Sequence, residues 1–218
     1  MTLVDRWLAA LHIPANPLNT AAYHDLIARY AERHRRYHDL RHLTEVLDIV
    51  DELADEAEDP DAVRLAAWFH DAVYAALSEV SNEEASACLA ERLLPAVGVP
   101  AARVAEAARL VRLTENHAAE DGDRNAAVLF DADLAILAAS PARYDEYAQA
   151  VRAEYREIPD EIFRPARARI LGALLAAPTL YRIPSARARF ESRARANLAA
   201  EIVALSGHLG MIRMLRCW

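Results

Sequence analysis

The pattern of alanine, glycine and proline limits the fold of this chain more than any other feature. Alanine makes up about a fifth of the 218 residues, whereas only five residues are glycine. Alanine is the strongest helix former and glycine is among the weakest, so this balance favours helices throughout. Prolines separate the segments with helical periodicity, because proline lacks an N–H and clashes with the preceding turn. The sequence predicts an all-α protein, a single-domain helical bundle of about eight to ten helices.

Eight of the prolines mark probable ends of helices. We expect each of them to lie between helices, at positions Pro60, Pro95, Pro100, Pro141, Pro159, Pro165, Pro178 and Pro184.

The charged residues exclude several classes of function. All 25 basic residues are arginine, so no lysine is present for a Schiff base, a pyridoxal phosphate enzyme or a P-loop. The formal net charge is −8, and a nucleic-acid polymer requires a basic surface. We therefore expect no nucleic-acid polymer as a partner.

Two further features concern the cellular location. The longest uncharged run, residues 170–181, is too short to cross a bilayer, so we expect no membrane partner. The first residues lack the apolar stretch of a signal peptide. Cys88 and Cys217 form neither a metal-type pair nor a disulfide framework, which favours a reducing compartment. These observations predict a cytoplasmic protein.

Two helical segments each place a histidine on the side that periodicity assigns to the core. In the segment 37–53, His42 shares a face with the apolar residues at positions 46, 49 and 53. In the segment 62–77, His70 shares a face with positions 63, 67, 74 and 77. Burying an unpaired imidazole costs a few kcal/mol, so each histidine requires a partner in the core.

Carboxylates in apolar surroundings accompany these histidines. Asp71 directly follows His70, and Asp131 and Asp133 lie in a hydrophobic run further along the chain. Imidazole nitrogen and carboxylate oxygen are ligands that suit Zn, Mn, Fe, Ni or Mg. Residues two apart on a helix point about 200° away from each other, so Asp131 and Asp133 cannot face the same way. Periodicity slightly favours Asp133 as the inward residue, and Asp131 stays an alternative at the helix start.

Six short motifs follow one another along the chain. They are Arg-x-Tyr-His-x-x-x-His, Phe-His-Asp-x-x-Tyr, Asn-Glu-x-x-Ser-Ala, Thr-x-x-His, Asp-x-Asp-Leu and Arg-x-Glu-Tyr, at residues 35–42, 69–74, 82–87, 114–117, 131–134 and 152–155. In this order they resemble the HD superfamily of metal-dependent phosphohydrolases, and the resemblance is closer to a bacterial branch of predicted HD phosphohydrolases whose substrate is unassigned.

The resemblance covers most of the chain. We expect residues 1–205 to form the HD-type domain and residues 206–218 to form a C-terminal tail of unknown role. The segment Ala75–Leu77 departs from the polar loop that is frequent in the family, which leaves the substrate contacts of that loop open.

The resemblance implies a divalent metal ion, with Mn, Mg, Ni, Co, Fe and Zn as alternatives. Its expected ligands are His42, His70, Asp71 and one of the two later aspartates, Asp131 or Asp133. Asp71 is also expected to accept the proton of the attacking water. Glu83 is a second candidate base, with Glu84 as an alternative, although a glutamate there also suits the first turn of a helix that Asn82 caps.

Five further residues are candidates for binding the substrate, and each has an alternative role. They are His38, Arg36, Arg41, His117 and Arg152. His38 could instead contact a metal ligand, His117 could complete a second metal site, and each arginine could simply lie on the surface. A guanidinium offers paired donors to a phosphate, which is why the arginines are included.

The implied reaction is hydrolysis of a phosphomonoester or phosphodiester, in a small, nucleotide-like substrate. A metal ion lowers the pKa of bound water and polarises a phosphoryl oxygen. One alternative is a non-catalytic HD-like protein that binds a nucleotide as a sensor or scaffold. Another is a metalloenzyme that acts on a substrate without phosphate.

Overall fold

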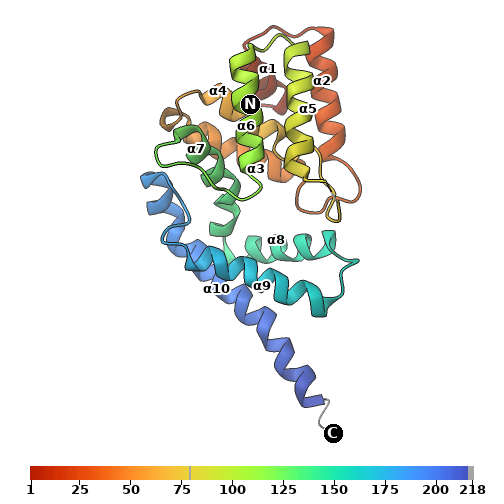
Figure 1. Ribbon diagram of the computed structural model, residues 1–218, viewed down its shortest axis with the longest axis vertical. Coiled ribbons are helices and arrows are strands. Elements are labelled where there is room, and N and C mark those ends of the chain that lie inside the picture. Colours follow the sequence, from red (N-terminus) through yellow and green to blue (C-terminus); the bar gives the residue numbers. More distant parts are fainter. Residues whose placement is uncertain (79, 216–218) are drawn as a thin grey trace. The chain divides into compact units, whose positions relative to one another are not determined.

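The computed structural model describes residues 1–78 and 80–215, and this part of the chain is helical throughout, with ten α-helices, two 3₁₀ helices and no strand (Figure 1). The predicted all-α fold is confirmed. The chain divides into two compact units, Met1–Asp133 and Leu134–Trp218.

The first unit is built around one central helix, α4. This helix packs against α1, α3, α5, α6 and α7, and all of its residues from Leu65 to Phe69 are buried. The elements of this unit are α1 (Leu3–Leu11), α2 (Pro17–Tyr30), α3 (Leu40–Glu52), η1 (Ala54–Glu56), α4 (Pro60–Phe69), α5 (Asn82–Ala96), α6 (Ala101–Leu113) and α7 (Arg124–Asp133).

The second unit consists of the remaining four elements. They are η2 (Leu134–Ala138), α8 (Pro141–Glu154), α9 (Asp160–Ala176) and α10 (Pro184–Leu215). A partly buried polar network links three of them: Arg167 on α9 donates to Glu201 on α10 at 2.9 Å, and Tyr144 on α8 donates to the same carboxylate at 2.6 Å.

The predicted boundary between residues 205 and 206 stays a prediction. Helix α10 continues through that position to Leu215. Residues 216–218 of the expected tail, with Cys217, lie outside the described residues.

Two of the proline boundaries were wrong. Pro95 lies inside α5 and Pro165 lies inside α9. Each is within two turns of a helix end, where the loss of one backbone hydrogen bond interrupts little of the helix. The predicted N-cap of α5 was also wrong: the helix begins at Asn82, but Ser81 rather than Asn82 caps it and accepts from the N–H of Glu84.

No single helix among the described residues has both the length and the apolar composition needed to span a membrane. Residues 124–138 and 141–154 reach that length and composition only as a bent pair.

Candidate metal centre

His42 reaches the centre from the first turn of α3. Asp39 caps this helix, and its carboxylate accepts hydrogen bonds from the backbone N–H groups of Arg41 and His42, at 2.8 and 3.2 Å. The cap fixes where the helix begins, and therefore where the His42 side chain leaves the backbone. Its imidazole is 2% exposed, as the periodicity predicted.

His70 lies at the C-cap of α4, and a hydrogen bond orients its ring. Its Nδ1 lies 2.8 Å from the carbonyl oxygen of Ala67. A carbonyl only accepts, so Nδ1 carries the proton in this contact and Nε2 keeps its lone pair. Ligand histidines are commonly held in this way, with the nitrogen opposite the metal donating to a carbonyl.

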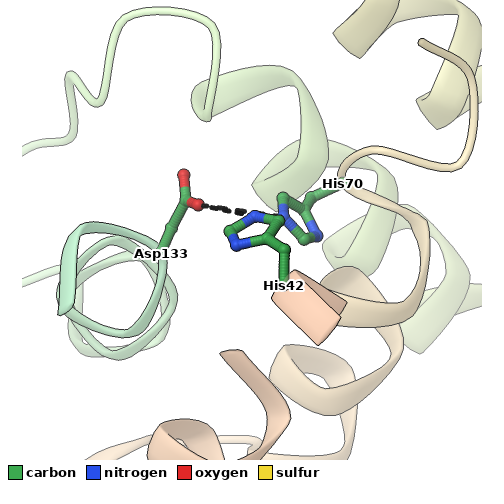
Figure 2. Close-up of side chains that lie close together, drawn as sticks. All are labelled: His42, His70 and Asp133. Atoms are coloured by element: carbon green, nitrogen blue, oxygen red, sulfur yellow. Dashed lines mark hydrogen bonds and ion pairs between the residues drawn. The ribbon is translucent and has the colours of Figure 1, made fainter. Parts of the chain in front are cut away.

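The two imidazoles and Asp133 converge from three helices (Figure 2). The Nε2 atoms of His42 and His70 are 3.1 Å apart. Asp133, the last residue of α7, places Oδ1 at 3.3 Å from Nε2 of His42 and at 3.8 Å from Nε2 of His70. These three residues, of which the histidines are buried and Asp133 is half-buried, form a group that could hold a metal ion.

Asp71 brings a further carboxylate to the same point. Its Oδ2 lies 3.3 Å from Nε2 of His42 and 3.1 Å from Nε2 of His70. Its side chain is 16% exposed, so most of the carboxylate is removed from water. The same oxygen thus faces both imidazoles from the residue directly after His70.

The spacing of these atoms fits ligands of one divalent ion. Metal–nitrogen and metal–oxygen bonds of about 2.0–2.2 Å place neighbouring ligand atoms about 2.8–3.6 Å apart in octahedral or tetrahedral geometry. Four of the separations between donors, from 3.1 to 3.3 Å, lie in that range. Two imidazoles and two carboxylates also match the ligand preferences of Zn, Mn, Fe and Ni.

The carboxylates favour positive charge at this centre. Burial lowers the pKa of His42, but hydrogen bonds and charge from Asp133 and Asp71 outweigh it and raise the pKa to about 10. Burial likewise lowers the pKa of His70, and the charge of Asp71 raises it above its ordinary value.

The two aspartates shift in the opposite direction. Burial raises the pKa of each carboxyl group, but it is outweighed at Asp71 by the charge of His70 and at Asp133 by the hydrogen bond from His117, so both pKa values are lowered. A protonated imidazole or a divalent cation supplies the positive charge that this arrangement favours.

The structure distinguishes the two later aspartates. Asp133 belongs to the cluster, as the periodicity slightly favoured, whereas Asp131 is fully buried and is not among these ligand atoms. Because the two residues are separated by about 200° around α7, only one of them can face α3 and α4.

The helix expected across residues 62–77 ends at Phe69, and the chain turns sharply after His70. No glycine or proline marks this end in the sequence. Tertiary hydrogen bonds replace those of the helix in the segment 71–75, which we call the Asp71 loop.

Arg35 holds the start of the Asp71 loop, a role that the sequence reading missed. Its guanidinium donates to the carbonyl oxygens of His38, Asp71 and Ala72, at 2.9, 2.7 and 3.2 Å. The group lies over the rings of Tyr30 and Tyr74, 5.2 and 5.6 Å from their centroids. The sequence does contain a signal for Arg35, because the first motif begins with this arginine.

Helix α5 holds the rest of the loop. Ser86 accepts a hydrogen bond from the N–H of Val73 and donates to its carbonyl, at 3.0 and 3.3 Å. Asn82 makes the same pair of bonds with Ala75, at 3.0 and 3.2 Å. Asn82 and Ser86 are four residues apart on one helical face, and both belong to the third motif.

Two of the residues predicted to bind substrate lie beside the donors. The ring of His38 stacks on Tyr74 with 4.2 Å between centroids, and its centroid is 5.8 Å from that of His42. His117 lies on the far side of Asp133, with its Nε2 at 2.9 Å from Oδ2.

The remaining predicted residues are not among the donors of the cluster. Arg36 is exposed, Arg41 pairs with Glu45 at 3.1 Å, and Glu83 accepts from the hydroxyl of Ser81 at 2.9 Å. Arg152 lies in the second unit, where it donates to Asp160 and to two backbone carbonyls. Their roles in substrate binding and in catalysis stay predictions.

Comparisons with protein-family models, with curated proteins and with solved structures gave no match to this chain.

Proposed function

We propose that this protein is a metal-dependent phosphohydrolase of the HD type. The observation that carries the proposal is the convergence of His42, His70, Asp71 and Asp133, with four donor separations of 3.1–3.3 Å. The order of the six motifs supports the same assignment. The substrate that we assign is a small phosphomonoester or phosphodiester of nucleotide-like chemistry.

A bound metal ion explains why four polar side chains are largely buried together despite the cost in free energy. Two imidazoles that are each 2% exposed and two carboxylates that are 16% and 18% exposed are removed from water at one point. Burying charged groups costs several kcal/mol per ion unless they are well paired. Coordination to a divalent cation compensates all four groups at once.

In this proposal each side chain of the candidate centre has a defined role. The residues that would hold the ion are His42, His70, Asp71 and Asp133, and the ion when bound supplies Lewis acidity for activating water and polarising a phosphoryl oxygen. Asp71 turns Oδ2 toward the imidazoles and accepts the proton of the attacking water on its other oxygen. The Arg35 hydrogen bonds keep the Asp71 backbone in place during this step.

Phosphate recognition is assigned to groups near the start of α3. The N-terminus of this helix favours negative charge, and Arg36 and Arg41 add two guanidinium groups there. The ring centroid of His38 is 5.8 Å from that of His42, so this imidazole also lies next to a metal ligand.

Metal titration of the chelator-treated protein tests the metal site. We expect one divalent ion among Mn, Mg, Ni, Co, Fe and Zn to bind at a defined stoichiometry. His70→Ala removes a donor and should weaken binding about 100-fold or more, while the circular dichroism stays helical. His24→Ala is the matched control, because His24 is exposed and lies outside the cluster. Unchanged metal binding by His70→Ala would count against the site.

A phosphate-release assay tests the chemistry. The wild-type protein with each metal is incubated with p-nitrophenyl phosphate, bis-p-nitrophenyl phosphate and a panel of nucleotides. The proposal predicts turnover that His70→Ala loses and His24→Ala keeps. Nucleotide binding without turnover would favour a sensor or scaffold, and metal binding without any phosphate release would favour a different substrate class.

A further inference from the structure

His117 has an unusual backbone conformation next to the candidate metal centre. Its φ is +52°, in the left-handed region, and among the described residues His12 is the only other non-glycine residue with positive φ. The backbone N–H of His117 donates to the carbonyl of Leu113 at 2.9 Å, which closes a turn after α6. Such turns usually carry glycine or asparagine at the left-handed position.

Histidine rather than glycine stands at this left-handed position. Glycine adopts the left-handed conformation without steric cost, whereas a side chain does so under strain. The contacts of the imidazole show what this side chain does there. Its edge packs against the buried ring of Phe130, with 5.0 Å between centroids, and its Nε2 points to Asp133.

The two oxygens of Asp133 have separate partners. Oδ1 lies 3.3 Å from Nε2 of His42, and Oδ2 lies 2.9 Å from Nε2 of His117. A carboxylate can rotate about the bond that joins it to the side chain, and a hydrogen bond on one oxygen fixes the direction of the other. The side chain of His117 is 28% exposed, so it forms the solvent-facing side of the group made by His42, Asp133 and His117.

We propose that His117 is a positioning residue that donates from Nε2 to Oδ2 of Asp133 and thereby turns Oδ1 toward His42 and His70. The inference rests on the metal site proposed above. It differs from the two roles that the sequence suggested for His117, substrate binding and ligation of a second metal ion. Loss of such a partner typically weakens metal binding about 10–100-fold.

Three substitutions at position 117 separate the imidazole from the backbone. His117→Ala removes the donor, and His117→Gln keeps an N–H donor at similar reach. Alanine and glutamine both carry a side chain in the left-handed conformation, so the difference between them isolates the hydrogen bond. His117→Gly removes the donor and also relieves the backbone strain.

The measurement is a Zn²⁺ and Mn²⁺ titration of chelator-treated protein by calorimetry, with urea unfolding of the metal-free protein beside it. We expect His117→Ala and His117→Gly to bind about 10–100-fold more weakly at unchanged stoichiometry, and His117→Gln to recover most of the affinity. His117→Gly should unfold at a higher urea concentration than His117→Ala, so the affinity loss cannot be a loss of folding.

His12 provides the matched control within the same chain. It also has positive φ, +53°, and its Nε2 pairs with an aspartate, Asp61, at 2.6 Å. Its side chain is 65% exposed, and neither residue belongs to the cluster. His12→Ala and His12→Gln should bind metal as the wild type does.

The outcomes separate this inference from the proposed function. Wild-type affinity in His117→Ala and His117→Gly would overturn the positioning role, as would a loss of one bound ion per chain in all three variants, which would make His117 a ligand. A wild-type protein that binds no divalent ion would contradict the metal site itself, and with it this inference.

Discussion

Several arginine side chains in this protein donate to backbone carbonyls as well as to carboxylates. Arg35 donates to three carbonyls next to the candidate metal centre, and Arg195 donates to those of Leu175, Ala177 and Pro178 at the end of α9 and just after it. A guanidinium presents five donors in a rigid plane, whereas an ammonium is a compact and strongly hydrated charge. In a chain that has no lysine, these positions depend on that planar geometry.

At the scale of the residue, we expect Arg35→Lys to lower the free energy of unfolding by about 1–3 kcal/mol. The Arg35 side chain is fully buried, and an ammonium at that position leaves carbonyl groups of the Asp71 loop without a donor. The measurement is urea denaturation. Arg36→Lys is the control, since Arg36 is exposed, and it should change stability by less than about 0.5 kcal/mol. An equal loss in both variants would refute the role of the buried guanidinium.

Helix α5 acts as a support for the residues that follow α4. Its first turns present Asn82 and Ser86 to the Asp71 loop, and each makes paired hydrogen bonds with one loop residue. The loop is thereby held between Arg35 on one side and α5 on the other. Asp71 can face the two imidazoles because the chain leaves the helix at His70 and is held outside it.

At the scale of the element, Ser86→Ala should destabilise the protein by about 1–3 kcal/mol. The Ser86 side chain is fully buried, and its loss leaves the N–H of Val73 without its acceptor. Thermal unfolding followed by circular dichroism measures the effect. Ser206→Ala on α10 is the comparison, because that serine is exposed and bonds only within its own helix. A Ser86→Ala protein as stable as Ser206→Ala would mean that the loop does not depend on α5.

The whole molecule places all four donors of the candidate centre in one compact unit. His42, His70, Asp71 and Asp133 all lie within Met1–Asp133, and Asp133 is its last residue. The resemblance, by contrast, predicts one domain over residues 1–205. The two descriptions differ in whether the first unit folds and binds metal by itself.

At this scale, we expect a fragment of residues 1–139 to fold and to bind metal with the stoichiometry of the full chain. The cut after Ala139 keeps Asp133 away from the new terminal carboxylate and precedes Ser140, which caps α8. Circular dichroism and the metal titration measure the two properties. A fragment 134–218 serves as the control and should bind no ion. An unfolded 1–139 fragment would instead support a single folding unit that extends to residue 205.

The sequence by itself determined the helical class, because alanine content and proline positions act through the local backbone. Periodicity placed His42, Val46, Ile49 and Leu53 on the inward face of α3, and the structure agrees in part: His42 and Val46 are buried, whereas Ile49 and Leu53 are partly exposed. The sequence predicted the exact ends of helices less reliably, because the position of an end can depend on a single hydrogen bond. Pro95, Pro165 and the N-cap of α5 are the examples.

Only the tertiary structure decided which inward faces meet. Periodicity places His42 on the core side of α3 and only slightly favours Asp133 over Asp131, and the 3.3 Å between Nε2 of His42 and Oδ1 of Asp133 depends on how α3 and α7 pack. The end of α4 at Phe69, the burial of Arg35 and the contact of His117 with Asp133 all depend on partners far along the chain. Helix formation depends mainly on atoms that are close along the chain. A metal centre requires particular distances between helices, and only the packing of those helices sets them.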